Sequence, residues 1–125
     1  MLRTLSLLAI SGAAGTVARY GLAAAVLRWR GPGFPWGTLA VNLLGCLLFG
    51  YFTTLADERN AISPETRLLL TTGFLGAFTT FSTFAWETTQ LGRAQQPLHA
   101  LLNVAAQVAI GLALAVAGSA IARRF

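Results

Sequence analysis

The stretch from Gly73 to Glu87, GFLGAFTTFSTFAWE, combines residue types that seldom share one apolar segment. Its aliphatic residues end at Leu75, and small hydroxyl side chains then stand among phenylalanines spaced three apart, Phe78, Phe81 and Phe84. The edge of a phenyl ring is positive, so a ring presented edge-on attracts a small anion weakly. Serine and threonine hydroxyls can donate to the same ion or back to their own helix. The stretch therefore fits either an anion path or a Phe-rich packing core.

The centre of the same stretch is a poor helix. Gly73 and Gly76 lower the helix propensity, and the β-branched side chains of the following threonines lower it further. A break near Gly76–Thr80 would free backbone carbonyls, which a membrane tolerates only where protein or a water-filled cavity covers them. Freed carbonyls can coordinate a hard monovalent cation, as in broken-helix transporters. We therefore expect an interrupted segment beside an ion-binding centre.

Other polar residues are few inside the apolar segments. They are Arg19, Asn42, Asn103 and Gln107. Asn103 and Gln107 are four residues apart and share a helix face, and the Asn42 amide can donate to an anion. Such side chains are costly in lipid and tend to face a partner or a pathway. Donors without fixed charge favour conduction, because a weakly bound ion can leave again.

Composition places these residues in a membrane protein rather than an enzyme. Of 125 residues, 55% are hydrophobic and 10% charged, whereas soluble domains carry about 25% charged residues. The mean hydropathy is +0.65. The net charge of +5 comes from nine scattered arginines, so no basic helix indicates nucleic acid. The chain has no paired nucleophile and base, no metal-ligand spacing and no phosphate loop, and Cys46 is expected to be a small buried hydrophobic residue.

Four apolar windows are long enough to cross a bilayer, which takes roughly 20 residues. They cover about 4–27, 37–56, 66–90 and 98–121 of a single domain, residues 1–125, in a multi-pass protein of the cell (inner) membrane. Ser63-Pro64-Glu65 is expected to start the third helix, with Pro at its first position. The N-terminus could be read as a signal peptide, but its apolar character resumes through Leu27, which favours a retained span.

Arginines are spread almost evenly over the two sides of the membrane. The side with both termini carries Arg3, Arg59, Arg67, Arg123 and Arg124, and the other carries Arg28, Arg30 and Arg93. Five against three is a weak bias for the positive-inside rule, so the chain could insert both ways. Four short spans enclose little by themselves. An antiparallel pair of copies would form an inverted repeat with sites near the midplane.

Three segments and the four-span layout carry a likeness to a known family. The segments are GAAGTVARY (12–20), PWGTLAVNLLG (35–45) and TGFLGAFTTFSTFAWE (72–87). Over essentially its whole length the chain resembles the CrcB/Fluc family of bacterial fluoride channels. The resemblance implies an all-α membrane protein with a break in the third helix, working as an antiparallel, dual-topology homodimer in the lipid bilayer. It also implies a fluoride-specific channel that lowers cytoplasmic fluoride by passive export of the anion.

The resemblance also implies roles for particular residues. The fluoride pathway would be lined by Asn42, Phe81, Ser82, Thr83, Phe84, Asn103 and Gln107, with Phe81 and Phe84 as the paired rings. A structural Na⁺ that is not transported would be held by the carbonyls of Gly76 and Thr79 from both subunits. Arg19 would draw anions to the entrance or, on the simpler reading, anchor its helix at the interface.

The chain departs from the family at two places, and two other functions stay open. Ala77 stands where the family has a second glycine, and Phe78 after it would be a third ring or face lipid. On the fourth span, Asn103 and Gln107 stand in the region of the family's hydroxyls. The main alternative is a small dual-topology multidrug or cation exporter, which needs a membrane carboxylate and could use Glu87. A structural protein that conducts nothing is the third possibility.

Overall fold

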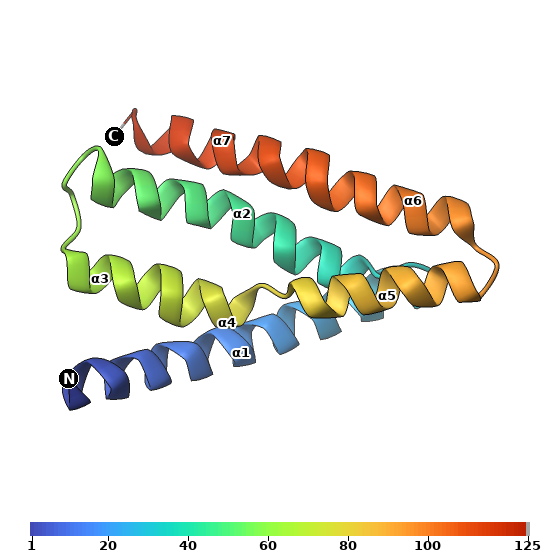
Figure 1. The fold of residues 1–125 in the computed structure, drawn as a ribbon, viewed down its shortest axis with the longest axis horizontal. Coiled ribbons are helices and arrows are strands. Elements are labelled where there is room, and N and C mark those ends of the chain that lie inside the picture. The colour runs from blue at the N-terminus through green and yellow to red at the C-terminus, as the bar shows by residue number, and fades with distance from the viewer. Residues whose placement is uncertain (125) are drawn as a thin grey trace.

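The computed structural model describes residues 1–124, which form helices joined by short connections (Figure 1). Within them, four stretches are long and apolar enough to cross a membrane, namely Leu2–Arg30, Trp36–Asp57, Pro64–Arg93 and Pro97–Ala122. Each runs back along its predecessor, so the N-terminus, the α2–α3 connection and the end of α7 lie at one end of the bundle (Figure 1). The all-helical, four-span architecture expected from the sequence is confirmed.

The first two spans are single helices, α1 (Leu2–Arg30) and α2 (Trp36–Asp57). The third and fourth spans are assembled from shorter pieces that include π-helical turns. The third consists of α3 (Pro64–Leu68), η1 (Leu69–Leu75), α4 (Gly76–Phe78) and α5 (Phe81–Arg93); the fourth consists of α6 (Pro97–Ala105), η2 (Ala106–Ile110) and α7 (Gly111–Ala122). Because π-helical turns inside α-helices are frequent at functional sites, these two spans are candidates to carry the functional site.

The third span starts where the sequence predicts. The Ser63 side chain accepts a hydrogen bond from the backbone N–H of Thr66 at 3.1 Å, and Pro64 occupies the first turn of α3. The hydroxyl accepts from one of the N–H groups that have no partner within the first turn. Proline has no N–H, and at this position an N–H would have no helical partner, so no hydrogen bond is lost. The expected helix start at Ser63-Pro64-Glu65 is confirmed.

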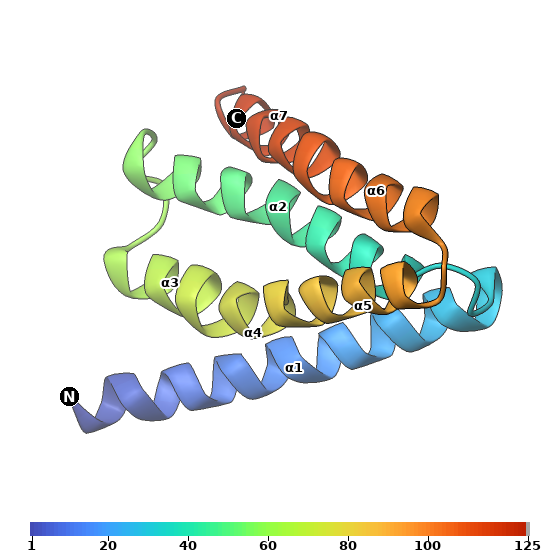
Figure 2. The ribbon, with the colours of Figure 1, turned by 45° about the vertical axis from the view of Figure 1, so that its right-hand side comes forward.

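Glycines let the helices approach closely, most clearly between α2 and α7. A Cβ atom on Gly50 would overlap the backbone carbonyl of Ala115, and one on Gly118 would overlap that of Leu47. Ser119 adds a hydrogen bond from its hydroxyl to the Gly50 carbonyl at 3.3 Å. Small residues at a helix–helix seam are typical of membrane bundles. Figure 2 shows α7 lying along α2, while α1 crosses beneath the third span.

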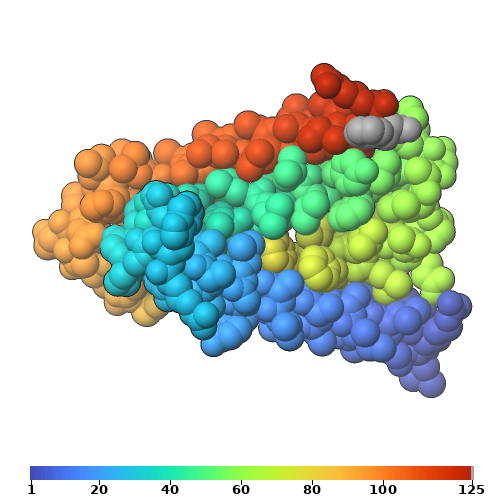
Figure 3. Space-filling view, turned by 180° about the vertical axis from the view of Figure 1, so that it is seen from behind, coloured from blue at the N-terminus to red at the C-terminus, as the bar shows by residue number. Residues whose placement is uncertain are grey.

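The buried centre lies where α1 and α2 meet the middle of the third span. Val41, Leu75 and Phe78 are almost fully buried there. Phe78 stacks on Phe74 with ring centroids 5.8 Å apart, because residues four apart share a helix face. Phe78 is therefore a core residue of the subunit and does not face lipid. The space-filling view from behind shows this segment, in yellow, through the seam between α1 and α2 (Figure 3).

Candidate functional site

The third span is interrupted at two residues. The α4 helix ends at Phe78, the backbone is extended at Thr79 (φ −84°, ψ 159°) and Thr80 (φ −151°, ψ 109°), and α5 begins at Phe81. The Thr80 hydroxyl caps the new helix by accepting from the N–H of Thr83 at 3.3 Å. The break predicted near Gly76–Thr80 is confirmed, and Figure 1 shows the extended link between α4 and α5.

The break takes helical hydrogen-bond partners away from the carbonyls beside it, including those of Gly76 and Thr79. In a continuous helix the N–H of Thr80 would donate to the Gly76 carbonyl, and that of Thr83 to the Thr79 carbonyl. Here the Thr80 N–H donates to the Asn42 side chain and the Thr83 N–H to the Thr80 hydroxyl. Freed carbonyl oxygens are the ligands that unwound helices offer to Na⁺. The carbonyls of Gly76 and Thr79 thus have the chemistry that the family resemblance implies for them.

Asn42 holds the break from the neighbouring helix. Its Oδ1 accepts from the backbone N–H of Thr80 at 2.8 Å, and its Nδ2 donates to the Thr80 carbonyl at 3.0 Å. The same Nδ2 donates to Oε1 of Gln107 at 3.1 Å. One side chain on α2 therefore joins the break in the third span to the π-helical turn η2 in the fourth.

Phe81 and Phe84 meet edge to face beside this network. Their ring centroids are 5.5 Å apart and their planes are inclined at 63°. Phe84 is buried, whereas Phe81 is 78% exposed and projects from the subunit. Both rings line a cavity of about 310 Å³ together with Asn42 and Gln107. The other residues lining this cavity, which we call the break cavity, are Gly45, Cys46, Phe49, Thr79, Thr80 and Val108.

Ser82, Thr83 and Asn103 lie outside the break cavity. Ser82 and Thr83 are exposed at the start of α5, where the Thr83 hydroxyl accepts from that of Thr80 at 2.9 Å. Asn103 is fully buried, and its Nδ2 donates to the Thr88 hydroxyl at 2.9 Å. That hydroxyl donates in turn to the Phe84 carbonyl at 2.8 Å. Asn103 therefore fixes α5, and with it Phe84, against α6.

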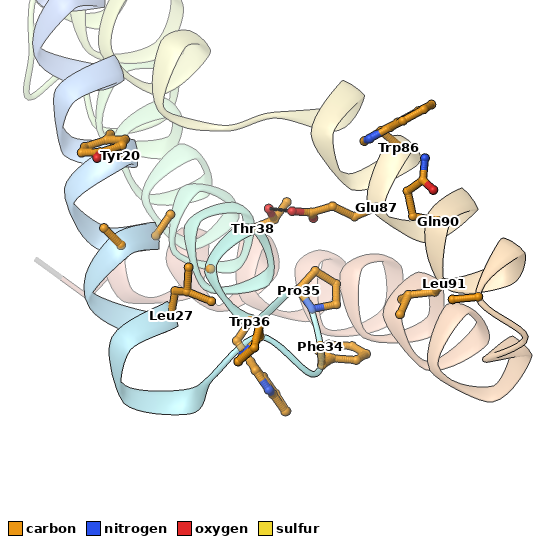
Figure 4. Close-up of a pocket in the computed structure, with 15 residues that line it drawn as sticks. Tyr20, Leu27, Phe34, Pro35, Trp36, Thr38, Trp86, Glu87, Gln90 and Leu91 are labelled. Carbon is orange, nitrogen blue, oxygen red and sulfur yellow. Dashed lines mark hydrogen bonds between the residues drawn. The ribbon is translucent and has the colours of Figure 1, made fainter.

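A second cavity of about 630 Å³ lies between the ends of α1 and α5 and the start of α2 (Figure 4). Thr38 and Glu87 point toward one another across it, and the Thr38 hydroxyl donates to Oε1 of Glu87 at 2.9 Å. Oε2 of Glu87 is buried without a hydrogen-bond partner among the described residues. The sequence analysis did not single out Thr38. Glu87 could have indicated it, because a carboxylate inside a membrane span needs a hydrogen-bond donor. A carboxylate repels anions, so this second cavity is chemically unlike the break cavity.

Charge is distributed differently at the two ends of the bundle. Three ion pairs join the elements at the end with the N-terminus, namely Arg3–Glu65 (3.3 Å), Arg67–Asp57 (3.0 Å) and Arg123–Glu58 (2.7 Å). At the other end, the Arg30 guanidinium stacks over the Trp36 ring at 4.0 Å, and that of Arg93 lies 5.8 Å from the Trp86 ring.

Arg19 is half-buried in α1 and lines neither cavity.

These features define the class: an all-helical, multi-pass membrane protein whose broken third span lies against a polar cavity. The family model described as "CrcB-like protein, Camphor Resistance (CrcB)" matches residues 6–119 of the chain. Three similar relatives come from Nitrosococcus oceani (45% identical), Solidesulfovibrio magneticus (46%) and Chlorobaculum tepidum (48%), each over 123 residues. The alignments cover 98% of this chain and 97–98% of the relatives, and each relative carries the name "Fluoride-specific ion channel FluC".

The chain belongs to the CrcB family. The family model matches most of the chain, and the identity is near 45% over almost all of it, so the similarity extends over all four spans. The matched residues include the break, Asn42 of α2 and Gln107 of η2, so the residues of the break cavity can be interpreted within this family.

Proposed function

We propose that the protein is a fluoride-specific ion channel that lets the anion pass down its gradient. One observation carries the proposal: in a member of a family whose relatives are named fluoride channels, the broken span brings Phe81, Phe84 and two amides to one cavity. Ring edges and amide hydrogens are donors without fixed charge. Fluoride would bind such a surface weakly enough to move on. The protein is a channel and not an enzyme.

The pathway we propose comprises Asn42, Phe81, Ser82, Thr83, Phe84, Asn103 and Gln107, with different tasks. Asn42, Gln107 and the two rings line the break cavity. Ser82 and Thr83 are exposed at the start of α5, so they would line the path only against a second copy. Asn103 would act indirectly, through the hydrogen-bond chain that ends on the Phe84 carbonyl.

An antiparallel, dual-topology homodimer would complete the site. Phe81 is 78% exposed beside the break cavity, so the cavity is unfinished in one subunit. Three arginines at the end with the N-terminus are engaged with carboxylates, and the arginine bias is already weak. Two copies in opposite orientations would form an inverted repeat with its sites near the midplane. The dimer would have two parallel pathways, and its remaining apolar surface would face lipid.

A structural Na⁺ would lie at the centre of that dimer. The carbonyls of Gly76 and Thr79 lose their helical partners at the break, and each subunit would supply both. When bound, the ion would neutralise oxygens that otherwise repel one another and would hold the two breaks together. It would not be transported, because the carbonyls of the two breaks enclose it.

Arg19 would raise the local anion concentration at the entrance. It lies on α1 without an ion pair among residues 1–124, so its charge is available to solution. In the cell (inner) membrane of an organism in acidic surroundings, HF would diffuse inward and dissociate, and the trapped anion would leave through the channel. The result would be protection against fluoride toxicity by passive export.

A small multidrug or cation exporter is the competing function, and one observation favours it. Glu87 has an unpartnered carboxylate oxygen beside a largely apolar cavity of about 630 Å³. Glu87→Gln and Phe81→Ala separate the two functions. An exporter would lose all transport with the first change and keep it with the second, and the channel would do the opposite.

Fluoride efflux from liposomes tests the proposal. Purified protein is reconstituted in vesicles loaded with both potassium fluoride and potassium chloride, valinomycin is added, and two ion-selective electrodes follow the release. The proposal predicts rapid fluoride release without chloride release. Equal release of both anions, or release of neither by a correctly assembled dimer, would contradict it.

A further inference from the structure

We propose that the end of the bundle with the α1–α2 and α5–α6 connections binds the phosphate of an anionic phospholipid, with Arg30 as its main ligand. The site concerns the lipid around the protein, so it goes beyond the proposed function and does not depend on it. Two features support it. The arginines at this end have no acidic partner, and two of them lie over tryptophan rings that line a cavity.

The arginines are paired differently at the two ends of the bundle. At the end with the N-terminus, three of the five arginines form ion pairs with carboxylates. The only other acidic residue of the chain is Glu87, which accepts a hydrogen bond from Thr38. The arginines at the opposite end, all exposed and without an ion pair among residues 1–124, are Arg28, Arg30 and Arg93. Their positive charges therefore need a counterion from outside the subunit.

Arg30 lies on aromatic rings, which leaves its hydrogen-bond donors free. The centre of its guanidinium is 4.0 Å from the centroid of the Trp36 ring and 5.6 Å from that of Trp29. Stacking uses the face of the guanidinium, whereas its five N–H groups lie in its plane. Two of these N–H groups can donate side by side to one phosphate. The tryptophans thus present Arg30 in a form suited to a phosphate.

Arg30 is placed at the depth where lipid phosphates lie. It is the last residue of α1, one of the four helical stretches long and apolar enough to cross a membrane. Trp29 precedes it and is exposed, and Trp36 is the first residue of α2. Tryptophans favour the level of the headgroups, where arginines meet anionic lipids. A lipid is therefore the phosphate source nearest to this side chain.

The second cavity adjoins the same arginines. Trp36 and Trp86 both line this cavity of about 630 Å³. The Arg30 guanidinium lies over the first of these rings and that of Arg93 over the second. Other large apolar residues of the lining are Leu27, Phe34, Pro35 and Leu91. An acyl chain suits this wall, whereas the Glu87 carboxylate in the cavity repels a phosphate, so the headgroup stays with the arginines.

Quenching of tryptophan fluorescence by brominated lipids measures this binding, because all three tryptophans lie on the elements that form the site. The full-length protein is reconstituted in phosphatidylcholine vesicles that contain a small fraction of brominated phosphatidylglycerol or, in parallel, of brominated phosphatidylcholine. The wild type should bind the brominated phosphatidylglycerol at least about fivefold better, since one arginine near an anionic lipid gives roughly that factor. Equal quenching by the two lipids, or quenching by neither, would overturn the proposal.

Two arginine variants test where the lipid binds. Arg30→Gln removes the guanidinium and should lower the preference for phosphatidylglycerol about fivefold. Arg59→Gln makes the same change at an exposed arginine of the other end, which has no ion pair among residues 1–124, and should keep the preference. An equal loss in both variants would mean that anionic lipid is attracted to the net charge of the protein, and would overturn the site.

Inorganic phosphate distinguishes a lipid from a soluble ligand. Millimolar phosphate added to the wild-type vesicles, at constant ionic strength, should leave the preference for brominated phosphatidylglycerol unchanged, because the acyl chain keeps the lipid beside the arginines. Loss of the preference would assign the arginines to a phosphate from solution and would overturn the lipid as the ligand.

Discussion

The two halves of the third span behave as different kinds of structure, although they form one membrane crossing. Before the break, η1 and α4 lie against α1, and Thr71, Gly73, Leu75 and Phe78 are buried. After it, α5 packs mainly on α6, and of its first four residues only Phe84 is buried. The break separates a half that holds the subunit together from a half that presents the Phe81 ring and hydroxyls outward.

This difference explains why a membrane helix gives up its continuity. In a continuous helix, the N–H groups of Thr80 and Thr83 would bond within the helix. Phe81 and Phe84 would then point in nearly the same direction as the buried Phe78. Extended backbone at two residues resets that face, so that buried packing stops at Phe78 and the ring pair begins at Phe81. Changes before the break should therefore act on stability, and changes after it on conduction.

The largest effect is expected after the break, from Phe81→Ala. Removing the exposed ring of the edge-to-face pair should lower fluoride efflux about 100-fold or more, which corresponds to about 2.7 kcal/mol in the barrier. The fold of the subunit should be intact, because the ring is 78% exposed in the subunit. Trp86→Ala, which removes another exposed ring from α5, is the control and should stay within about threefold of wild type. Equal losses in both variants would show that any bulky residue on α5 suffices.

Where α1 packs on the half of the third span before the break, Gly15→Val should lower stability instead. A Cβ on Gly15 would overlap the backbone carbonyl of Phe74, which cannot rotate away. Overpacking of this kind costs about 1–3 kcal/mol or more, so the melting temperature in detergent should fall by several degrees. Gly21→Val is the matched control on the same helix, because a Cβ there meets no atom within 4 Å. Two variants of equal stability would refute the close contact between α1 and η1.

A smaller effect is expected from Glu87→Gln, further along α5. The amide oxygen can still accept from the Thr38 hydroxyl, so the contact at 2.9 Å persists and only the charge is lost. Because Glu87 lines the second cavity and not the break cavity, fluoride efflux should change by less than about threefold. Efflux assays on proteoliposomes give the rate, and complete loss of transport would favour the exporter.

The smallest effect lies away from the third span, in the pair of Glu58 and Arg123. The guanidinium donates to the carboxylate at 2.7 and 2.8 Å and lowers the pKa of Glu58 below its ordinary value. A lowered pKa in the folded state stabilises the protein above the unfolded pKa, roughly 4.3. That stabilisation is lost as the pH falls through the folded pKa, and salt weakens it because the pair is exposed.

Melting curves of the wild type and Glu58→Gln from pH 7 to pH 3 measure this pair. The small difference between the two should shrink below about pH 4 and at high salt. Arg59→Gln, which removes an exposed neighbouring charge that has no ion pair among residues 1–124, serves as the control for loss of an unpaired surface charge. A difference that grows on acidification would mean that the pair destabilises the fold.

The sequence predicts the features that depend on neighbouring residues and does not predict those that join residues far apart along the chain. Glycines and β-branched threonines predict the break, and Ser63 with Pro64 predicts the start of its span, because these are local effects of neighbouring residues. The bonds from Asn42 to Thr80 and Gln107 join positions 38 and 65 residues apart, and no periodicity encodes them. The burial of Phe78 does not follow from the sequence either, because it depends on the phase of a helix that ends at Phe78 itself.

The reversal potential of the channel tests the central claim most directly. Membranes containing the protein are held with equal potassium on both sides, a tenfold gradient of fluoride, and chloride making up the balance. The account predicts a reversal potential near the fluoride equilibrium value, about 59 mV from zero for a tenfold gradient. A reversal at zero would mean that the pathway carries fluoride and chloride alike, or potassium, and would contradict a fluoride-specific channel.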